Sequence, residues 1–116
     1  MTRKQAISRA ALDVRLRRYG SWYQVEEPCD ALRPHGPATL TSFRRRAEAV
    51  EYRARACASY ALVLLGMSYI GADRAVAAAI AKGHRRSREL MTAAAKWARE
   101  DASRRICTRT KGEEKR

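Results

Sequence analysis

The most constraining feature of this sequence is a series of small and apolar residues that recur at steps of three and four between positions 43 and 64. The series comprises Phe43, Ala47, Val50, Ala54, Cys57, Ala61 and Leu64. Such spacing places side chains on one face of an α-helix. Thr41 or Ser42 is suited to cap its start, and Gly66 to end it, because glycine readily adopts a left-handed conformation. The pattern therefore predicts a long central helix over 42–65 that forms the hydrophobic spine of the fold.

A second apolar pattern with helical spacing precedes the central helix. Its members, at i, i+4, i+7 and i+11, are Leu12, Leu16, Tyr19 and Tyr23. This spacing predicts a first helix over residues 6–25. The periodicity then disappears over residues 26–41, a segment that contains all three prolines of the chain. We predict a loop there, and its length of about 15 residues is typical of a functional or mobile segment.

The C-terminal part of the chain predicts two helices joined by a tight turn, over residues 72–106. Small apolar side chains give the first helix a face that another helix can approach closely, and an inward stripe follows on the last helix. These residues are Val76, Ala77 and Ile80, followed by Leu90, Ala94 and Trp97. Gly83 lies between them and can take the left-handed conformation of a turn. This is the outline of a helix-turn-helix, although a plain helical hairpin has the same outline.

Together these patterns predict an all-α fold. We expect one small helical domain at 1–106, with a long central helix and a C-terminal helix-turn-helix, because no segment has the pattern of a strand. A length of 116 residues allows one domain with a modest core. The charged, glycine-containing segment 107–116 is expected to form a disordered tail.

The charge of the chain sets the expected class of partner. It carries 25 Lys and Arg against 12 Asp and Glu, a net charge of +13, and its pI is near 10.7. Such a balance indicates a polyanionic partner. Nucleic acid, above all double-stranded DNA, is the first candidate, followed by an acidic protein surface or an anionic membrane.

Basic residues crowd the expected starts of two helices. A cation at a helix N-terminus opposes the helix dipole by about 0.3–1 kcal/mol, which indicates that a polyanionic partner compensates it. A solvated basic face is the alternative interpretation. The candidate nucleic-acid-binding residues are Lys82, His84, Arg85, Arg86 and Arg88 at the turn, and Arg44, Arg45 and Arg46 at the start of the central helix.

The sequence lacks the patterns of catalytic, cofactor and metal sites. Its three cysteines, Cys29, Cys57 and Cys107, are scattered and form no CxxC pair, so neither zinc nor a disulfide framework is expected. It has no glycine-rich phosphate loop and no Ser/His/Asp set, so we expect no enzyme, no cofactor and no small-molecule substrate. It has no signal peptide or membrane-spanning segment, which predicts a soluble, cytoplasmic protein without membrane contact.

The order of the expected elements resembles that of a known family. A Tyr-Gly-x-Trp segment (Tyr19 to Trp22) precedes the loop, a Tyr/Gly junction (Tyr69 to Gly71) follows the long helix, and an Ala-x-x-Trp sequence ends at Trp97. In these features the chain is similar to small phage antitermination proteins of the Q type. The C-terminal part of that family resembles the helix-turn-helix of the DNA-reading fourth region of sigma factors.

The resemblance implies a phage late-gene regulator that binds DNA near a promoter, engages the RNA polymerase of the bacterial host and makes it read through terminators. It implies no catalysis. The alternative function is a small basic helical protein that binds and inhibits or modulates an acidic host protein complex. Binding to RNA also stays open, although basic helices without an exposed aromatic sheet offer no platform for stacked bases.

Overall fold

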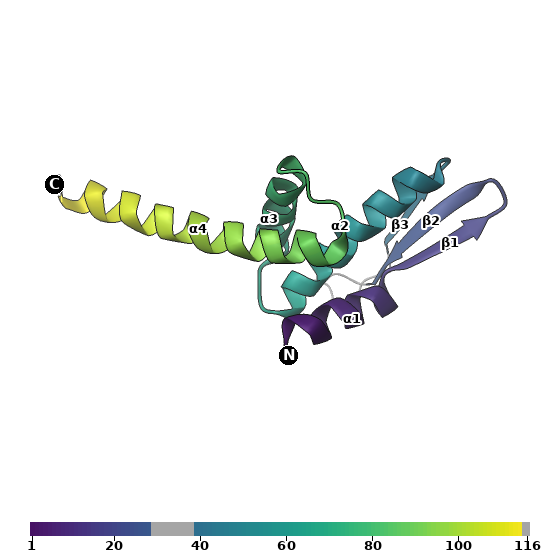
Figure 1. Ribbon diagram of the computed structural model, residues 1–116, viewed down its shortest axis with the longest axis horizontal. Helices are drawn as coiled ribbons and strands as arrows, with labels where there is room; N and C mark the ends of the chain where they lie inside the picture. The colour runs from purple at the N-terminus through teal and green to yellow at the C-terminus, as the bar shows by residue number, and fades with distance from the viewer. Residues whose placement is uncertain (29–38, 115–116) are drawn as a thin grey trace.

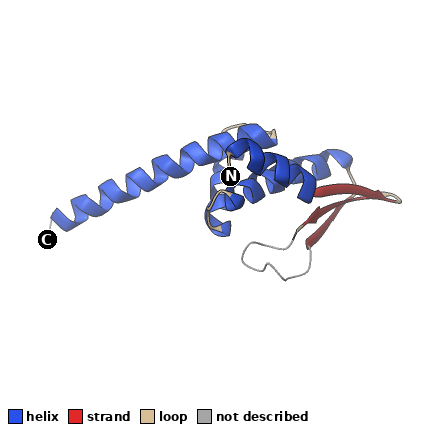
Figure 2. Cartoon of the chain, turned by 90° about the horizontal axis from the view of Figure 1, so that it is seen from below, coloured by secondary structure: helices blue, strands red, loops and turns tan. Residues whose placement is uncertain are grey.

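The computed structural model describes residues 1–28 and 39–114, with side chains as far as Arg105. Within these ranges the chain forms four helices and a three-stranded antiparallel sheet (Figure 1, Figure 2). In chain order the elements are α1 (Arg3–Asp13), β1 (Arg15–Tyr19), β2 (Trp22–Glu27), β3 (Thr39–Phe43), α2 (Arg46–Leu64), α3 (Tyr69–Ala81) and α4 (Ser87–Glu114). None of the helices described is both long and apolar enough to cross a membrane.

The predicted all-α fold is wrong, because the region expected to form one helix over 6–25 forms a helix and a β-hairpin. α1 ends at Asp13, and β1 and β2 follow, joined by a two-residue turn. Gly20, at the first position of this turn, has a φ of +58°. Glycine reaches this region without steric cost, and a two-residue turn with glycine at its first position matches the twist of paired strands. The chain therefore folds back on itself here.

The predicted loop over 26–41 is wrong at both ends. β2 continues to Glu27 and β3 begins at Thr39, while residues 29–38 lie outside the described part of the chain. β3 pairs with β2, which gives the sheet the strand order β1-β2-β3. The residues at both ends of the predicted loop therefore belong to paired strands, although their lack of helical periodicity had predicted irregular structure.

One face of the sheet packs on α2. Leu16, Val25 and Thr41 are paired across the three strands on this face, and Val25 is fully buried. Further along the same face the ring of Phe43 contacts that of Tyr52 on α2, with the ring centroids 5.2 Å apart. Because side chains alternate between the faces of a strand, the residues between these positions lie on the opposite face.

The helix α2 is the centre of the fold and contacts each of the other described elements. It begins at Arg46, later than the predicted 42–65, because the expected capping residues Thr41 and Ser42 belong to β3. The buried face also differs from the predicted stripe, since Val50 is 42% exposed. The buried residues of α2 are Ala49, Cys57, Ala58, Ser59, Ala61 and Leu62. The face is shifted because helices and strands cover α2 on several sides.

Alanine dominates the core. The buried alanines are Ala6, Ala10, Ala49, Ala58, Ala61, Ala72, Ala75, Ala79 and Ala94, and they come from all four described helices. Their short side chains let the helices approach one another closely. The largest fully buried side chains are Leu62, Leu90, Val14, Val25 and Val76. Since a buried alanine removes little apolar surface from water, these few larger residues supply much of the hydrophobic stabilisation.

A side chain from α2 caps the C-terminus of α1. Arg53 Nε donates a hydrogen bond to the Val14 carbonyl at 3.1 Å, and Arg53 Nη2 donates to the Ala11 carbonyl at 3.0 Å. The carbonyl groups of the last helical turn have no partner within the helix. A guanidinium group satisfies them and also interacts favourably with the negative end of the helix dipole. Arg53 therefore fixes the point at which α1 ends and the hairpin begins.

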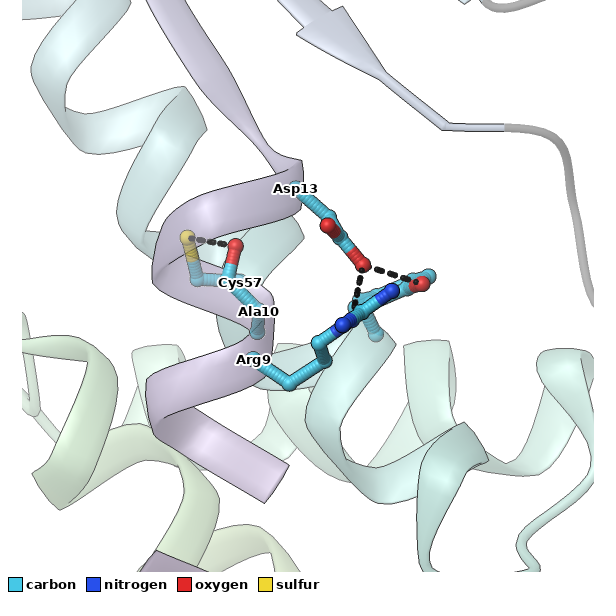
Figure 3. Close-up of polar contacts among 5 residues, drawn as sticks. Arg9, Ala10, Asp13 and Cys57 are labelled. Atoms are coloured by element: carbon cyan, nitrogen blue, oxygen red, sulfur yellow. Dashed lines mark hydrogen bonds and ion pairs between the residues drawn. The ribbon is translucent and has the colours of Figure 1, made fainter. Parts of the chain in front are cut away.

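Two further side chains of α2 contact α1 (Figure 3). The thiol of Cys57 donates to the Ala10 carbonyl at 3.7 Å, and burial raises the pKa of this thiol. The hydroxyl of Tyr60 donates to a carboxylate oxygen of Asp13 at 2.9 Å, and Arg9 forms an ion pair with the same oxygen at 3.0 Å. These contacts hold the C-terminal half of α1 along α2.

The helix α4 extends away from the rest of the protein, at the end opposite to the hairpin (Figure 1). It continues to Glu114, so the segment predicted as a disordered tail, 107–116, is helical as far as that residue. The helix α3 begins at Tyr69, where the Ser68 hydroxyl caps its first turn. The two helices predicted over 72–106 are therefore both present, and both are longer than predicted.

We expect Arg53→Met to lower the free energy of unfolding by about 1.5–3 kcal/mol, because two carbonyl groups lose a charged hydrogen-bond donor. Methionine keeps much of the aliphatic part of the side chain. Arg74→Met, at an exposed position of α3, is the matched control and should change stability by less than about 0.5 kcal/mol. Urea denaturation followed by circular dichroism measures both variants. Equal stability of the two would contradict the capping role of Arg53.

Candidate nucleic-acid interface

The turn between α3 and α4 has the geometry of a Schellman motif. Gly83 has a φ of +97°, its N–H donates to the Ile80 carbonyl at 2.9 Å, and the His84 N–H donates to the Ala79 carbonyl at 3.2 Å. This pairing satisfies carbonyl groups at the end of α3 and requires a left-handed residue in the turn. The conformation predicted for Gly83 is confirmed. Gly66, with a φ of +103°, ends α2 in the same way, also as predicted.

The chain enters α4 directly after this turn. The Arg86 carbonyl accepts a hydrogen bond from the Leu90 N–H at 2.8 Å, which closes the first turn of the helix. Leu90 and Met91 are buried on the inner side of α4, as predicted for Leu90, whereas Arg86 and Arg88 are exposed. The N–H groups of a first helical turn have no partner within the helix. Arginine side chains therefore surround a helix end that attracts anions.

The structure brings the five predicted residues of this turn together. Lys82, Arg85, Arg86 and Arg88 are exposed, and His84 is half-buried. The ion pairs formed between described residues lie elsewhere, and they join Arg9 to Asp13, Lys96 to Glu100 and Arg105 to Asp101. The positive charge of the turn is therefore not neutralised by ion pairs within the described part of the chain.

Two residues of the turn face carboxylates of α2. A hollow of about 340 Å³ separates the turn from the first half of α2, and His84 and Arg85 line it together with Glu48 and Glu51. Within the described residues no ion pair joins Arg85 to either carboxylate. The two carboxylates still lower the local positive potential, so the exposed arginines beyond the hollow are the better candidates for contacts with phosphate.

The arginines predicted at the start of α2 lie on the side of the sheet. Arg44, Arg45 and Arg46 are all exposed. The Arg44 guanidinium lies over the ring of Trp22 in β2, 4.8 Å from its centroid. Arg46 lines a shallow hollow with Arg17 and Arg18 of β1. The structure therefore groups these two arginines with cations of the hairpin, and not with the turn before α4.

A second basic surface, which the helical interpretation of the sequence did not predict, lies on the face of the sheet that points away from α2. We call it the outer sheet face, and its strand residues are Arg15, Arg17, Tyr19, Trp22, Gln24, Glu26, Leu40 and Ser42. The signal in the sequence is the two-residue alternation on both sides of the turn at 20–21. Helical spacing of apolar residues in the same segment concealed it.

A further hollow, of about 360 Å³, lies between β2, α2 and α3. Its polar lining includes Glu27, Arg55, Tyr52 and Asp73, and burial raises the pKa of Tyr52. Its rim includes the residues that flank segment 29–38, which lies outside the described part of the chain, so we assign it no ligand. In the described ranges no group of three or more His, Cys, Asp or Glu side chains is placed to hold a metal ion.

Comparison with known proteins does not assign the chain to a family. No family model, no curated protein and no solved structure matches it. The interpretation of its surfaces therefore depends on their own geometry and charge.

We expect Gly83→Ala to lower the free energy of unfolding by about 1–2 kcal/mol, because an L-residue is strained in the left-handed conformation. A Cβ at this position meets no atom within 4 Å, so the cost arises from the backbone alone. Gly83→Asn should lose less, because asparagine tolerates positive φ better than alanine. Urea denaturation compares the three proteins. Wild-type stability of Gly83→Ala would show that the turn can take another conformation.

Proposed function

We propose that this chain is a DNA-binding transcription regulator that contacts duplex DNA with the α3–α4 turn and the first turn of α4. The observation that carries the proposal is the set of exposed arginines around this helix start, which form no ion pair with described carboxylates. A net charge of +13 supports a polyanionic partner. Packing of α4 on the core through its opposite side leaves the arginines accessible.

The chemistry of the α4 start suits DNA. The N–H groups and the positive dipole end of the helix attract a phosphate, and the planar guanidinium groups of Arg86 and Arg88 can hold phosphate oxygens in pairs. In helix-turn-helix proteins the first residues of the second helix contact base edges in the major groove. Arg85 is suited to guanine, whose O6 and N7 accept two parallel hydrogen bonds from arginine.

The transcriptional part of the proposal comes from the resemblance to phage antitermination proteins of the Q type. It is supported by the order of the C-terminal elements, in which two helices packed on each other follow the long helix α2. Such a regulator would engage the RNA polymerase of a bacterial host, in its cytoplasm, and change its response to terminators. The Tyr-Gly-x-Trp segment of the resemblance lies in the hairpin of β1 and β2 and not in a helix, so the N-terminal part of the chain does not support this assignment.

The DNA proposal is tested by titrating a labelled 30-base-pair duplex and following fluorescence anisotropy at several salt concentrations. We expect Arg86→Gln with Arg88→Gln to weaken binding at least about tenfold. The plot of log K against log salt should become shallower by about two, since two phosphate contacts are lost.

The matched control is Arg9→Gln with Arg105→Gln, which removes the same charge from two arginines that already form ion pairs far from the turn. It should change affinity by less than about twofold. If the two double variants bind equally, the α4 start is not the DNA contact. If the wild type shows no salt-dependent DNA binding, the proposed function is wrong, and an acidic protein surface becomes the partner to examine.

A further inference from the structure

Two aromatic rings lie next to each other on the outer sheet face. Tyr19 of β1 and Trp22 of β2 are directly opposite in the strand register, beside the tight turn of the hairpin. Tyr19 is 52% exposed and Trp22 is 41% exposed. The helices lie on the other side of the sheet (Figure 2). Large exposed apolar side chains that are grouped on one face indicate an interaction site.

Two arginines are neighbours of these rings. The Arg44 guanidinium lies over Trp22, and Arg17 is next to Tyr19 on the same face of β1, while Arg15 lies further along the strand. Among the described strand residues of this face, Glu26 is the only carboxylate, and it lies opposite Arg15, away from the rings. Exposed rings flanked by cations bind unpaired nucleotides, because bases stack on the rings while phosphates lie near the guanidinium groups.

We propose that the outer sheet face binds unpaired DNA, with bases stacked on Tyr19 and Trp22. The inference deepens the proposed function and rests on it, because DNA bound at α4 is the source of the unpaired strand. Bases inside a duplex are covered by their neighbours and offer only their edges, so a duplex cannot supply base faces to these rings. The carboxylates of an acidic protein surface would satisfy the arginines but are repelled by the negative faces of the rings.

The position of Arg44 connects the outer sheet face with the α4 start. Phe43 and Glu48, on either side of Arg44 in the chain, line the same hollow as His84 of the α3–α4 turn. The start of α2 therefore lies between the two basic surfaces. A strand that separates from a duplex held at α4 can reach the rings past the exposed side chains of Arg44 and Arg45, on the side of the α2 start that faces away from Glu48 and Glu51 in the hollow. Arg44 also covers one side of the Trp22 ring, which holds the indole in place for a base on its other side.

The proposal is tested with a labelled 12-nucleotide single-stranded DNA and the labelled duplex, titrated separately. We expect Trp22→Ala with Tyr19→Ala to weaken single-strand binding at least about tenfold and to leave duplex binding within about twofold. Trp22→Phe should keep most of the affinity because it keeps a ring. In a Trp97→Phe background, the fluorescence of Trp22 should be quenched by the single strand and not by the duplex.

Leu40→Ala is the matched control. Leu40 lies on the same face and is 61% exposed, but it offers no ring for stacking. Its substitution should leave both affinities within about twofold. Loss of single-strand binding in Leu40→Ala, with the rings intact, would indicate a general apolar contact and overturn the stacking proposal. Circular dichroism confirms that each variant is folded before it is titrated.

The two proposals fail in different ways. If the wild type binds duplex but not the single strand, the inference is wrong and the proposed function stands. If the ring variants lose duplex and single strand equally, the face is part of the duplex contact and the inference is again wrong. Tighter binding of a 12-nucleotide RNA of the same sequence would overturn the assignment to DNA. Unchanged duplex binding in the variant Arg86→Gln with Arg88→Gln would contradict the proposed duplex contact at α4, and it would not change the result for the single strand.

Discussion

The whole fold depends on the packing of small side chains around α2. This helix contacts every other described element, and alanines line the contacts of all four described helices. Short side chains allow α1, α3, α4 and the sheet to reach the same helix. Polar contacts then fix the arrangement, such as the hydrogen bonds from Arg53 to the end of α1 and from Ser59 to Asp73 of α3. Both basic surfaces are positioned by this one helix, since the α3–α4 turn and the outer sheet face lie on either side of its start.

The features that could be predicted from the sequence are those set by local chemistry. Gly66 and Gly83 were recognised because a helix end with a left-handed residue depends on a few neighbouring positions. The two C-terminal helices were recognised because their periodicity has no competing interpretation. The exposure of Arg86 and Arg88 followed from the pattern of α4, since the inward position of Leu90 places these two arginines on the outer side of the helix. These helix ends were therefore accessible without a structure, whereas the caps expected at Thr41 and Ser42 were wrong because both residues pair in β3.

The hairpin could not be predicted in this way, because its residues satisfy two periods at once. Leu16, Tyr19 and Tyr23 have helical spacing, yet Leu16 and Tyr23 also lie on the inner face of paired strands, with Tyr19 on the outer face. Packing against α2 decides between the helical and the strand period, and the sequence does not show that contact. The same reason explains Val50, whose predicted burial depended on which side of α2 the sheet would cover. The contact of the Arg44 guanidinium with the Trp22 ring could not be predicted either, because it forms only when the hairpin is present.

The distribution of ion pairs connects the fold with the proposed partners. Within the described residues, pairs with carboxylates lie on α1 and on the distant part of α4, while the cations of the α4 start and the outer sheet face have none. Folding therefore gathers positive charge at two accessible surfaces, and mutual repulsion there opposes the compact state. A small core that consists largely of alanine has little stability to offset this repulsion. A bound polyanion would remove the repulsion and add binding free energy to the folded state, so we infer that binding and stability are coupled in this protein.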